Sequence, residues 1–118
     1  MIRPKRGDIY LVNFDPTLGA EIRKTRPALI LQNDIANKFS PVTIVAAISS
    51  RFDDSLYPTE VLISAKSRTG LAVDSVVLLN QIRTVDKKRL AQRLGRLSSA
   101  KMEEVNQALR ISVGLVSL

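Results

Sequence analysis

Cysteine and histidine are both absent from this 118-residue chain, and each absence excludes a kind of chemistry. Without cysteine, the chain has no disulfides, no thiol nucleophile and no thiolate ligand for a metal, which is consistent with a reducing cytoplasm. Without histidine, it lacks the side chain that most often transfers protons near neutral pH. Any catalysis must therefore use Arg, Lys, Asp, Glu, Ser, Thr or Tyr side chains.

Long apolar runs are also missing. The longest are Ala28–Leu31, Ile44–Ile48 and Val76–Leu79, far short of the roughly 20 residues that span a bilayer. The basic stretch MIRPKRGDIY at the N-terminus is not followed by an apolar segment, so it does not resemble a secretory signal. We expect one soluble, cytoplasmic domain over residues 1–118, without a membrane segment.

Acidic side chains are outnumbered by basic ones. There are 18 Lys and Arg residues against 11 Asp and Glu, which gives a net charge of +7. In a small domain, this excess favours polyanionic partners, chiefly nucleic acid or an acidic protein. The alternative is that the charge only keeps a small protein in solution.

Most of the chain is expected to form short strands. The segment Asp8–Phe14 is apolar on both alternating faces, so it is predicted to be buried on both sides. Asn33–Pro41 contains turn-forming residues and predicts a turn or a single helical turn. The other predicted strands, several of them rich in β-branched residues, are Ala28–Gln32, Val42–Ser49, Tyr57–Ile63, Ser75–Leu79, Ile82–Val85 and Arg93–Leu97.

The C-terminal part changes to a helical pattern. Apolar residues recur at steps of three and four from Met102 to Val116, and Ser99 is placed to cap the first turn. We predict an amphipathic helix over Ala100–Val116, packed on the sheet, and a shorter helix that begins near Asp86. Short strands with a terminal helix predict a mainly β fold, namely a small twisted β-barrel.

The segment Asp15–Thr25 joins two strands that are predicted to pair as a hairpin. It is longer than the roughly two to five residues of a tight hairpin, and long loops between rigid strands are often binding elements. Arg26 follows this loop and directly precedes Pro27, which pushes Arg26 towards extended geometry and so fixes its direction. A guanidinium held in this way suits phosphate, because its planar fork binds two oxygens at once. The alternative is a solvated, basic hairpin tip.

Five segments between Arg6 and Leu90 form an ordered set of motifs, within a match that covers essentially the whole chain. They are RGDIYLVNFDP at Arg6–Pro16, GAE at Gly19–Glu21, TRPALILQND at Thr25–Asp34, SPVTIVAAIS at Ser40–Ser49 and LLNQIRTVDKKRL at Leu78–Leu90. In this order they resemble the MazF/PemK toxins of bacterial type II toxin–antitoxin systems, and most closely the MazF-like subgroup.

This resemblance implies an SH3-like β-barrel with a C-terminal α-helix, the fold of MazF, PemK and CcdB, assembled as a homodimer. It implies a sequence-specific, metal-independent endoribonuclease, an mRNA interferase without a cofactor, that cleaves single-stranded RNA and inhibits growth. Attack by the RNA 2′-hydroxyl would leave 2′,3′-cyclic phosphate and 5′-hydroxyl ends. It also implies an acidic antitoxin that neutralises the toxin by occupying the RNA groove between subunits.

The resemblance further implies three catalytic residues. Arg26 matches the family's catalytic arginine before proline, and Glu21 matches the glutamate of the first loop. Ser49 falls where MazF-like members usually have a catalytic threonine. Serine keeps the hydroxyl but lacks the methyl group that restricts rotation.

RNA binding is expected from Arg23, Lys24, Gln81 and Arg83. Gln81 is a candidate for reading a base edge, and the alternative is a buried amide bonded to the backbone. The basic residues from Arg83 to Arg96 form either a phosphate track or a solvated face.

PemK-like members use a loop histidine and an Arg/Asp pair, and this sequence departs from them. The corresponding places hold Ala20, Leu78 and Asn80. Activity would therefore have to rest on Arg26 and Ser49. Two other functions stay open: a catalytically silent RNA-binding barrel, and a CcdB-like poison of DNA gyrase.

Overall fold

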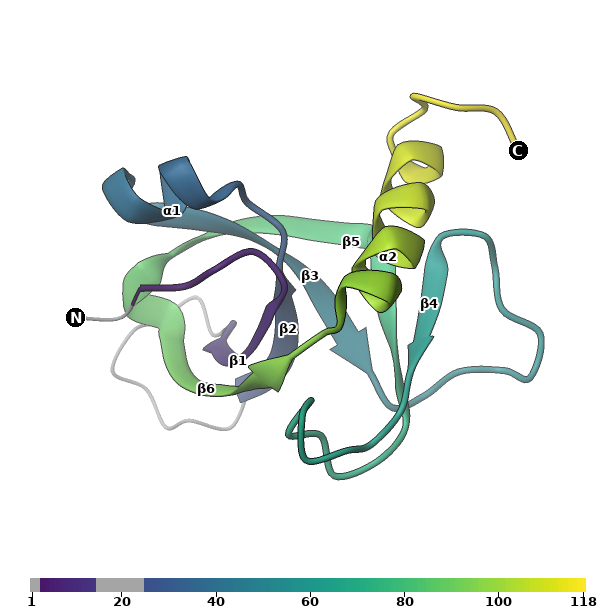
Figure 1. Cartoon of the computed structure of the whole chain (residues 1–118), viewed down its shortest axis with the longest axis horizontal. Coiled ribbons are helices and arrows are strands. Elements are labelled where there is room, and N and C mark those ends of the chain that lie inside the picture. The colour runs from purple at the N-terminus through teal and green to yellow at the C-terminus, as the bar shows by residue number, and fades with distance from the viewer. Residues whose placement is uncertain (1–2, 15–24) are drawn as a thin grey trace.

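A single antiparallel sheet organises the chain, with its strands in the order β4–β5–β3–β2–β1–β6. The computed structural model describes residues 3–14 and 25–118. The strands are β1 (Asp8–Asn13), β2 (Thr25–Ile30), β3 (Val42–Ser49), β4 (Glu60–Ile63), β5 (Ser75–Asp86) and β6 (Leu90–Arg96). The helices are α1 (Asp34–Phe39), the 3₁₀ helix η1 (Lys87–Arg89) and α2 (Ser99–Ser112), and α2 packs against β4 and β5 (Figure 1).

The sheet curls into a barrel-like shape, although its edge strands β4 and β6 are not paired with each other (Figure 1). One backbone bond partly bridges the gap: the Arg96 N–H donates to the carbonyl of Arg68, in the loop after β4, at 2.8 Å. The predicted mainly β, SH3-like class with a C-terminal helix is confirmed.

The central strands are buried on both faces because two apolar clusters form on opposite sides of the sheet. Ile9 and Leu29 belong to the cluster that α2 covers with Val105. Tyr10 and Ala28, one residue along each strand, belong to the second cluster. Alternation along a strand turns successive side chains to opposite faces. The prediction that Asp8–Phe14 is buried on both sides is therefore confirmed for β1.

Two predicted strands prove to be halves of one strand. β5 runs without interruption from Ser75 to Asp86, but its register against β3 shifts: Ala46 faces Ile82 whereas Ala47 faces Leu78. The residues between Leu78 and Ile82 form a bulge, which bends the strand. The sequence pattern was broken at this point, so it predicted two separate strands.

The ends of α2 differ from the prediction. Ser98, not Ser99, is the N-cap, because its hydroxyl accepts the Lys101 N–H at 3.1 Å. The helix ends at Ser112, not Val116, because Gly114 takes a left-handed φ of 78° and Leu115 N–H donates back to the Arg110 carbonyl, as in a Schellman motif.

The two short helices lie where the sequence predicted a helical turn and a short helix. α1 lies within Asn33–Pro41, and the Asn33 side chain caps it by accepting the Ala36 N–H. η1 begins after Asp86, whose carboxylate accepts the Lys88 N–H as expected. Within residues 3–14 and 25–118, no helix has the length and apolar character that crossing a membrane requires.

Replacing the two serines at the start of α2 tests the capping assignment. We expect Ser98→Ala to lower the free energy of unfolding by about 1 kcal/mol, because the Lys101 N–H loses its acceptor. Ser99→Ala, at an exposed position, should change it by less than about 0.5 kcal/mol. Urea unfolding of both variants measures the difference, and equal losses would contradict the assignment.

Candidate active site

A solvent-facing groove lies where β2 begins and β3 ends. Its larger lobe has a volume of about 460 Å³, and a smaller lobe of about 230 Å³ shares Arg26, Ala47, Ile48 and Gln81 with it. We call the two lobes together the Arg26 groove. The larger lobe is also lined by Pro27, Ser49, Ser50, Arg51, Leu71, Ala72, Val73, Ser75 and Leu78, and the smaller one by Phe14, Val45 and Arg83.

Strand register explains why Arg26 faces this groove. Arg26 lies opposite Val12 on β1, and Ala28, two residues along β2, lies opposite Ala47 on β3. Residues two apart on a strand share a face, so Arg26 and Ser49 extend the face that holds Ala28 and Ala47. That face is core at Val12 and Ala28 and becomes a groove at the strand ends. The structure thus brings the two predicted catalytic residues together.

The Arg26 side chain is exposed, and it makes no hydrogen bond or ion pair with any residue in 3–14 or 25–118. Several other arginines are engaged within the protein. Arg93 and Arg96 both contact the buried carboxylate of Asp8, at 3.3 and 2.9 Å, and Arg110 lies 3.8 Å from Glu103. Arg26 is therefore left with its full capacity to bind an anion from solution.

The hydroxyl of Ser49 has a local structural role. It accepts the Arg51 N–H at 3.1 Å and lies 3.3 Å from the Arg51 carbonyl, which fixes the turn after β3. The hydroxyl is half-buried and still lines the Arg26 groove. A hydroxyl has one proton, so Ser49 donates to a ligand oxygen by exchanging its long 3.3 Å bond to the Arg51 carbonyl for a bond to that ligand.

Gln81 lies in the bulge of β5 and lines both lobes of the groove. It is exposed, so the alternative of a buried amide is wrong. Leu78, at the place of an acidic or basic residue in PemK-like toxins, lines the larger lobe, and Asn80 is exposed. Among the described residues, the groove therefore presents Arg26, Ser49 and Gln81 without a carboxylate beside them.

Arg83 lies over the ring of Phe14, with its guanidinium carbon 5.0 Å from the ring centre. Both residues line the smaller lobe, and Phe14 packs against the second core cluster. This cation–π contact holds the guanidinium of Arg83 in a fixed orientation beside the groove.

Sequence reasoning missed Arg51 and the segment Leu71–Val73, which also line the larger lobe. Arg51 could have been found from its position two residues after Ser49 at the end of a strand. Leu71–Val73 carry no such signal, since they come from a loop that the fold brings across from β4. The predicted residues Glu21, Arg23 and Lys24 lie outside the described residues.

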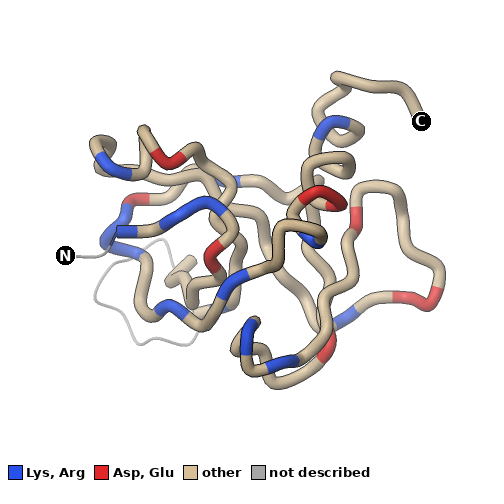
Figure 2. Tube along the Cα trace, viewed as in Figure 1, with Lys and Arg blue, Asp and Glu red and all other residues tan. Residues whose placement is uncertain are grey.

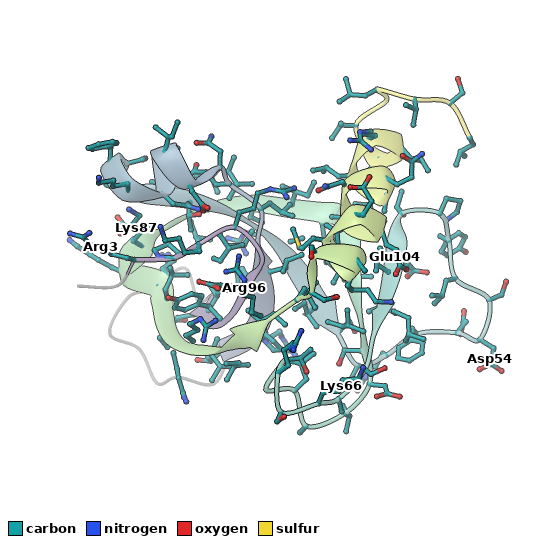
Figure 3. All side chains as sticks on the ribbon, viewed as in Figure 1. Arg3, Asp54, Lys66, Lys87, Arg96 and Glu104 are labelled. Carbon is teal, nitrogen blue, oxygen red and sulfur yellow. The ribbon has the colours of Figure 1, made fainter. Side chains whose placement is uncertain are left out.

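The basic residues after Arg83 are mostly engaged within the protein. Lys87 donates from Nζ to the Asn37 carbonyl, and Arg89 donates to the Asn13 carbonyl at 3.2 Å. Lys and Arg positions are nevertheless scattered along the chain trace (Figure 2). Lys87 lies near the end of the molecule that holds α1, and Lys66 lies on the loop after β4, at the bottom of the view (Figure 3). The basic residues from Arg83 to Arg96 therefore form neither a continuous phosphate track nor a purely solvated face.

Within residues 3–14 and 25–118, no three Asp, Glu, His or Cys side chains come together in a group that could hold a metal ion.

Comparison with known proteins identifies the family. Residues 5–113 match the family model described as the PemK-like, MazF-like toxin of type II toxin–antitoxin systems. This chain belongs to that family. It is 47% identical to the endoribonuclease EndoA of Bacillus subtilis over 95% of this chain and 96% of that protein. It is 51% identical to the endoribonuclease MazF of Staphylococcus saprophyticus, over 94% of this chain and 92% of that protein.

Solved structures of the PemK/MazF family share the fold. MazF from Deinococcus radiodurans superposes with a TM-score of 0.76 at 29% identity, covering 97% of this chain and 99% of that one. A chain of the MazE–MazF complex from the same organism superposes with a TM-score of 0.76 at 26% identity, covering 97% of this chain and 98% of that one. The barrel-like sheet and the terminal helix are thus family features.

Ser49→Ala tests whether the hydroxyl is needed for folding. We expect the free energy of unfolding to fall by about 1 kcal/mol or less, because one partly exposed hydrogen bond is lost. Ser50→Ala, next along the chain and exposed, is the matched control and should be neutral. Thermal or urea unfolding measures both; a loss of several kcal/mol would mean that Ser49 is chiefly structural.

Proposed function

We propose that this chain is an endoribonuclease toxin that cleaves single-stranded RNA in the Arg26 groove and is neutralised by an acidic antitoxin. Two relatives that share about half of its residues are named endoribonucleases. The observation that carries the proposal is the exposed guanidinium of Arg26, which has no partner among residues 3–14 and 25–118 and lines the same groove as Ser49.

RNA supplies its own nucleophile, so the protein needs only to align and stabilise the reaction. The 2′-oxygen forms a bond to phosphorus, its proton passes to a base, the bond from phosphorus to the 5′-oxygen breaks, and that oxygen takes a proton. The products are a 2′,3′-cyclic phosphate and a 5′-hydroxyl. Arg26 stabilises the extra negative charge on the phosphorane, and Ser49 orients a phosphate oxygen by hydrogen bonding.

An arginine is a poor base for the 2′-proton, because a guanidinium stays protonated at neutral pH. Glu21 on the first loop is our candidate, either as that base or as the group that positions Arg26. It lies outside the described residues, so its role is proposed from the family resemblance alone.

Recognition of RNA bases is assigned to the two residues of β5 that face the groove. Gln81 offers an amide that both donates and accepts, which suits the edge of an unstacked base. Arg83, which lies over the ring of Phe14, offers a planar guanidinium for stacking. Arg23 and Lys24 of the first loop are proposed to contact phosphates.

The family and the net charge support an acidic antitoxin, and the dimer is proposed from the family resemblance. A MazF relative has been solved in complex with MazE, and the net charge of +7 on this chain suits an acidic partner as well as RNA. We propose a homodimer in which the acidic antitoxin segment covers the groove and so blocks RNA.

Arg26→Ala is expected to reduce cleavage about 10²–10³-fold, because it removes a preorganised donor to the phosphorane. Arg26→Lys should also be impaired, since an ammonium cannot form the bidentate contact. Arg3→Ala removes an exposed arginine at the α1 end of the molecule and serves as the control (Figure 3).

Single-turnover cleavage of a long single-stranded RNA measures these variants. Wild-type rates from Arg26→Ala would overturn the catalytic assignment. If the wild-type protein retains RNA without cutting it, the chain is a silent RNA-binding barrel; if it only inhibits DNA supercoiling, it is a gyrase poison.

The chemistry of the RNA ends tests the mechanism separately. We expect cleavage to continue in EDTA and to leave 2′,3′-cyclic phosphate and 5′-hydroxyl ends, as measured by mass spectrometry of the fragments. Replacing the 2′-hydroxyl at the mapped cleavage site by hydrogen should abolish cutting at that site, because the nucleophile is gone. A 5′-phosphate product, or cutting of the deoxy-substituted site, would contradict attack by the 2′-oxygen.

A further inference from the structure

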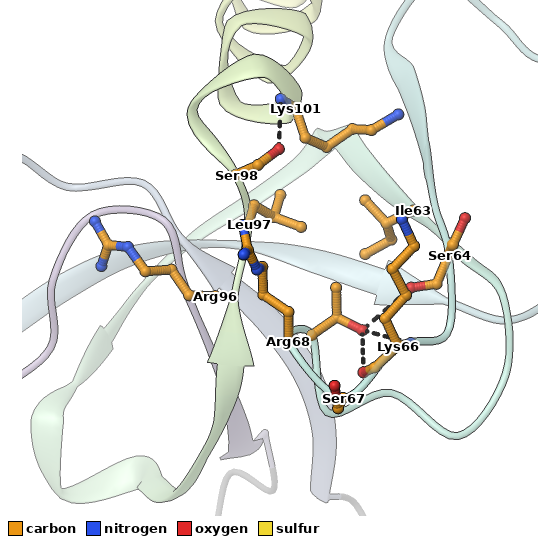
Figure 4. A pocket seen from close by; sticks show the side chains of 10 residues that line it. Ile63, Ser64, Lys66, Ser67, Arg68, Arg96, Leu97, Ser98 and Lys101 are labelled. Atoms are coloured by element: carbon orange, nitrogen blue, oxygen red, sulfur yellow. Dashed lines mark hydrogen bonds between the residues drawn. The ribbon is translucent and has the colours of Figure 1, made fainter.

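A second cavity, also of about 460 Å³, lies away from Arg26 between the loop after β4 and the junction of β6 with α2 (Figure 4). We call it the Lys66 cavity. It is lined by Ile63, Ser64, Lys66, Ser67, Arg68, Thr69, Arg96, Leu97, Ser98 and Lys101. Four of these residues are basic and none is acidic, so the cavity attracts anions.

The four cations are not equally free. Arg96 contacts Asp8 at 2.9 Å and turns away from the cavity, and Lys101 lies 3.1 Å from Glu104 (Figure 4). Lys66 and Arg68 are exposed and make no ion pair with any residue of the described chain. Their side chains extend from the loop along the cavity towards Ile63 and Leu97 (Figure 4). Two neighbouring positive charges therefore have no counter-charge in the part of the chain that the structure describes.

The backbone that carries Lys66 and Arg68 is fixed before any ligand arrives. The buried hydroxyl of Thr69 accepts the Lys66 N–H at 3.2 Å and contacts the Ser64 and Lys66 carbonyls at 3.1 and 3.0 Å. The loop also touches β6 so closely that a Cβ on Gly95 would lie 2.1 Å from the Arg68 carbonyl oxygen. A preformed loop lowers the ordering cost of binding.

The same loop forms a wall of the Arg26 groove. Lys66–Thr69 line the Lys66 cavity, and Leu71–Val73 line the groove. Only Gly70 separates the two sets, so the Cα atoms of Thr69 and Leu71 are at most about 7.6 Å apart. A chain of RNA that leaves the Arg26 groove across this loop would therefore reach the Lys66 cavity within a short distance.

We propose that Lys66 and Arg68 bind backbone phosphates of the RNA substrate outside the cleaved sequence. This inference rests on the proposed ribonuclease function. RNA is favoured over an acidic protein because the cavity adjoins the groove that holds the scissile phosphate, and because a guanidinium beside an ammonium matches successive phosphodiesters. The cavity contributes affinity for long RNA and takes no part in the chemical step.

The double variant Lys66→Gln/Arg68→Gln tests this site on two substrates. One is a long single-stranded RNA, and the other is a short oligonucleotide that carries only the cleavage site mapped in it. We expect KM for the long RNA to rise about tenfold at low salt, with kcat unchanged, and KM for the short oligonucleotide to stay the same. The slope of log affinity against log salt for the long RNA should become shallower by about 1.4, as two lost contacts predict.

The matched control is Lys5→Gln/Lys38→Gln, which removes the same charge from exposed residues beside α1. It should leave the long-RNA KM and the salt slope near wild type, and melting temperatures of both double variants check folding.

Three results would overturn the proposal: an unchanged KM for long RNA in the Lys66/Arg68 variant, an equal loss of affinity in the control, or an equal loss on both substrates. So would loss of neutralisation by the antitoxin with RNA affinity intact, which would assign the cavity to that protein. Failure of wild-type protein to cut either RNA would instead contradict the proposed function.

Discussion

The pairing of β2 with β1 on one side and β3 on the other is the constraint on which the site depends. This pairing puts Ala28 in the core and, two residues earlier on the same face, leaves Arg26 at the point where the core ends. Pro27 cannot donate a ladder hydrogen bond and restrains its neighbour to extended geometry, so the direction of Arg26 is set by the backbone. The sheet thus fixes the backbone from which the Arg26 side chain extends, while the charge of that side chain stays available to a ligand.

Charge is divided between structure and function by what lies next to each cation. The buried carboxylate of Asp8 engages Arg93 and Arg96 and also accepts the Lys5 N–H, so these arginines hold β6 to β1. Arg26, Lys66 and Arg68 have no such partner among the described residues. The net charge of +7 is therefore a poor guide to binding by itself, because part of it serves the fold.

Two local features, a bulge in β5 and the close approach of a loop to β6, bring remote residues to the groove. The bulge in β5 holds Gln81, which lines the same groove as Arg26. The close approach of the loop after β4 to Gly95 places Leu71–Val73 along the larger lobe. Both features re-aim side chains without adding an element, and bulges commonly do so beside functional sites.

The sequence by itself determined the elements and the family. Alternation in Asp8–Phe14 predicted a strand buried on two faces. The β-branched residues of Val42–Ser49 predicted β3 with the same first and last residues that the structure has. The ordered motifs pointed to Arg26 and Ser49. These signals are local, because periodicity and turn chemistry act over a few residues. They failed where a hydrogen bond chose between neighbours, as when Ser98 rather than Ser99 capped α2.

Tertiary structure alone decided which charges are free and which surfaces meet. No local pattern tells that Arg96 binds Asp8, 88 residues away, while Arg68 does not. No pattern tells that Leu71–Val73 and Arg51 border the groove, or that Gln81 is exposed within a bulge. These facts depend on strand register and on the packing of distant segments, which the chain fixes only when the whole sheet has formed.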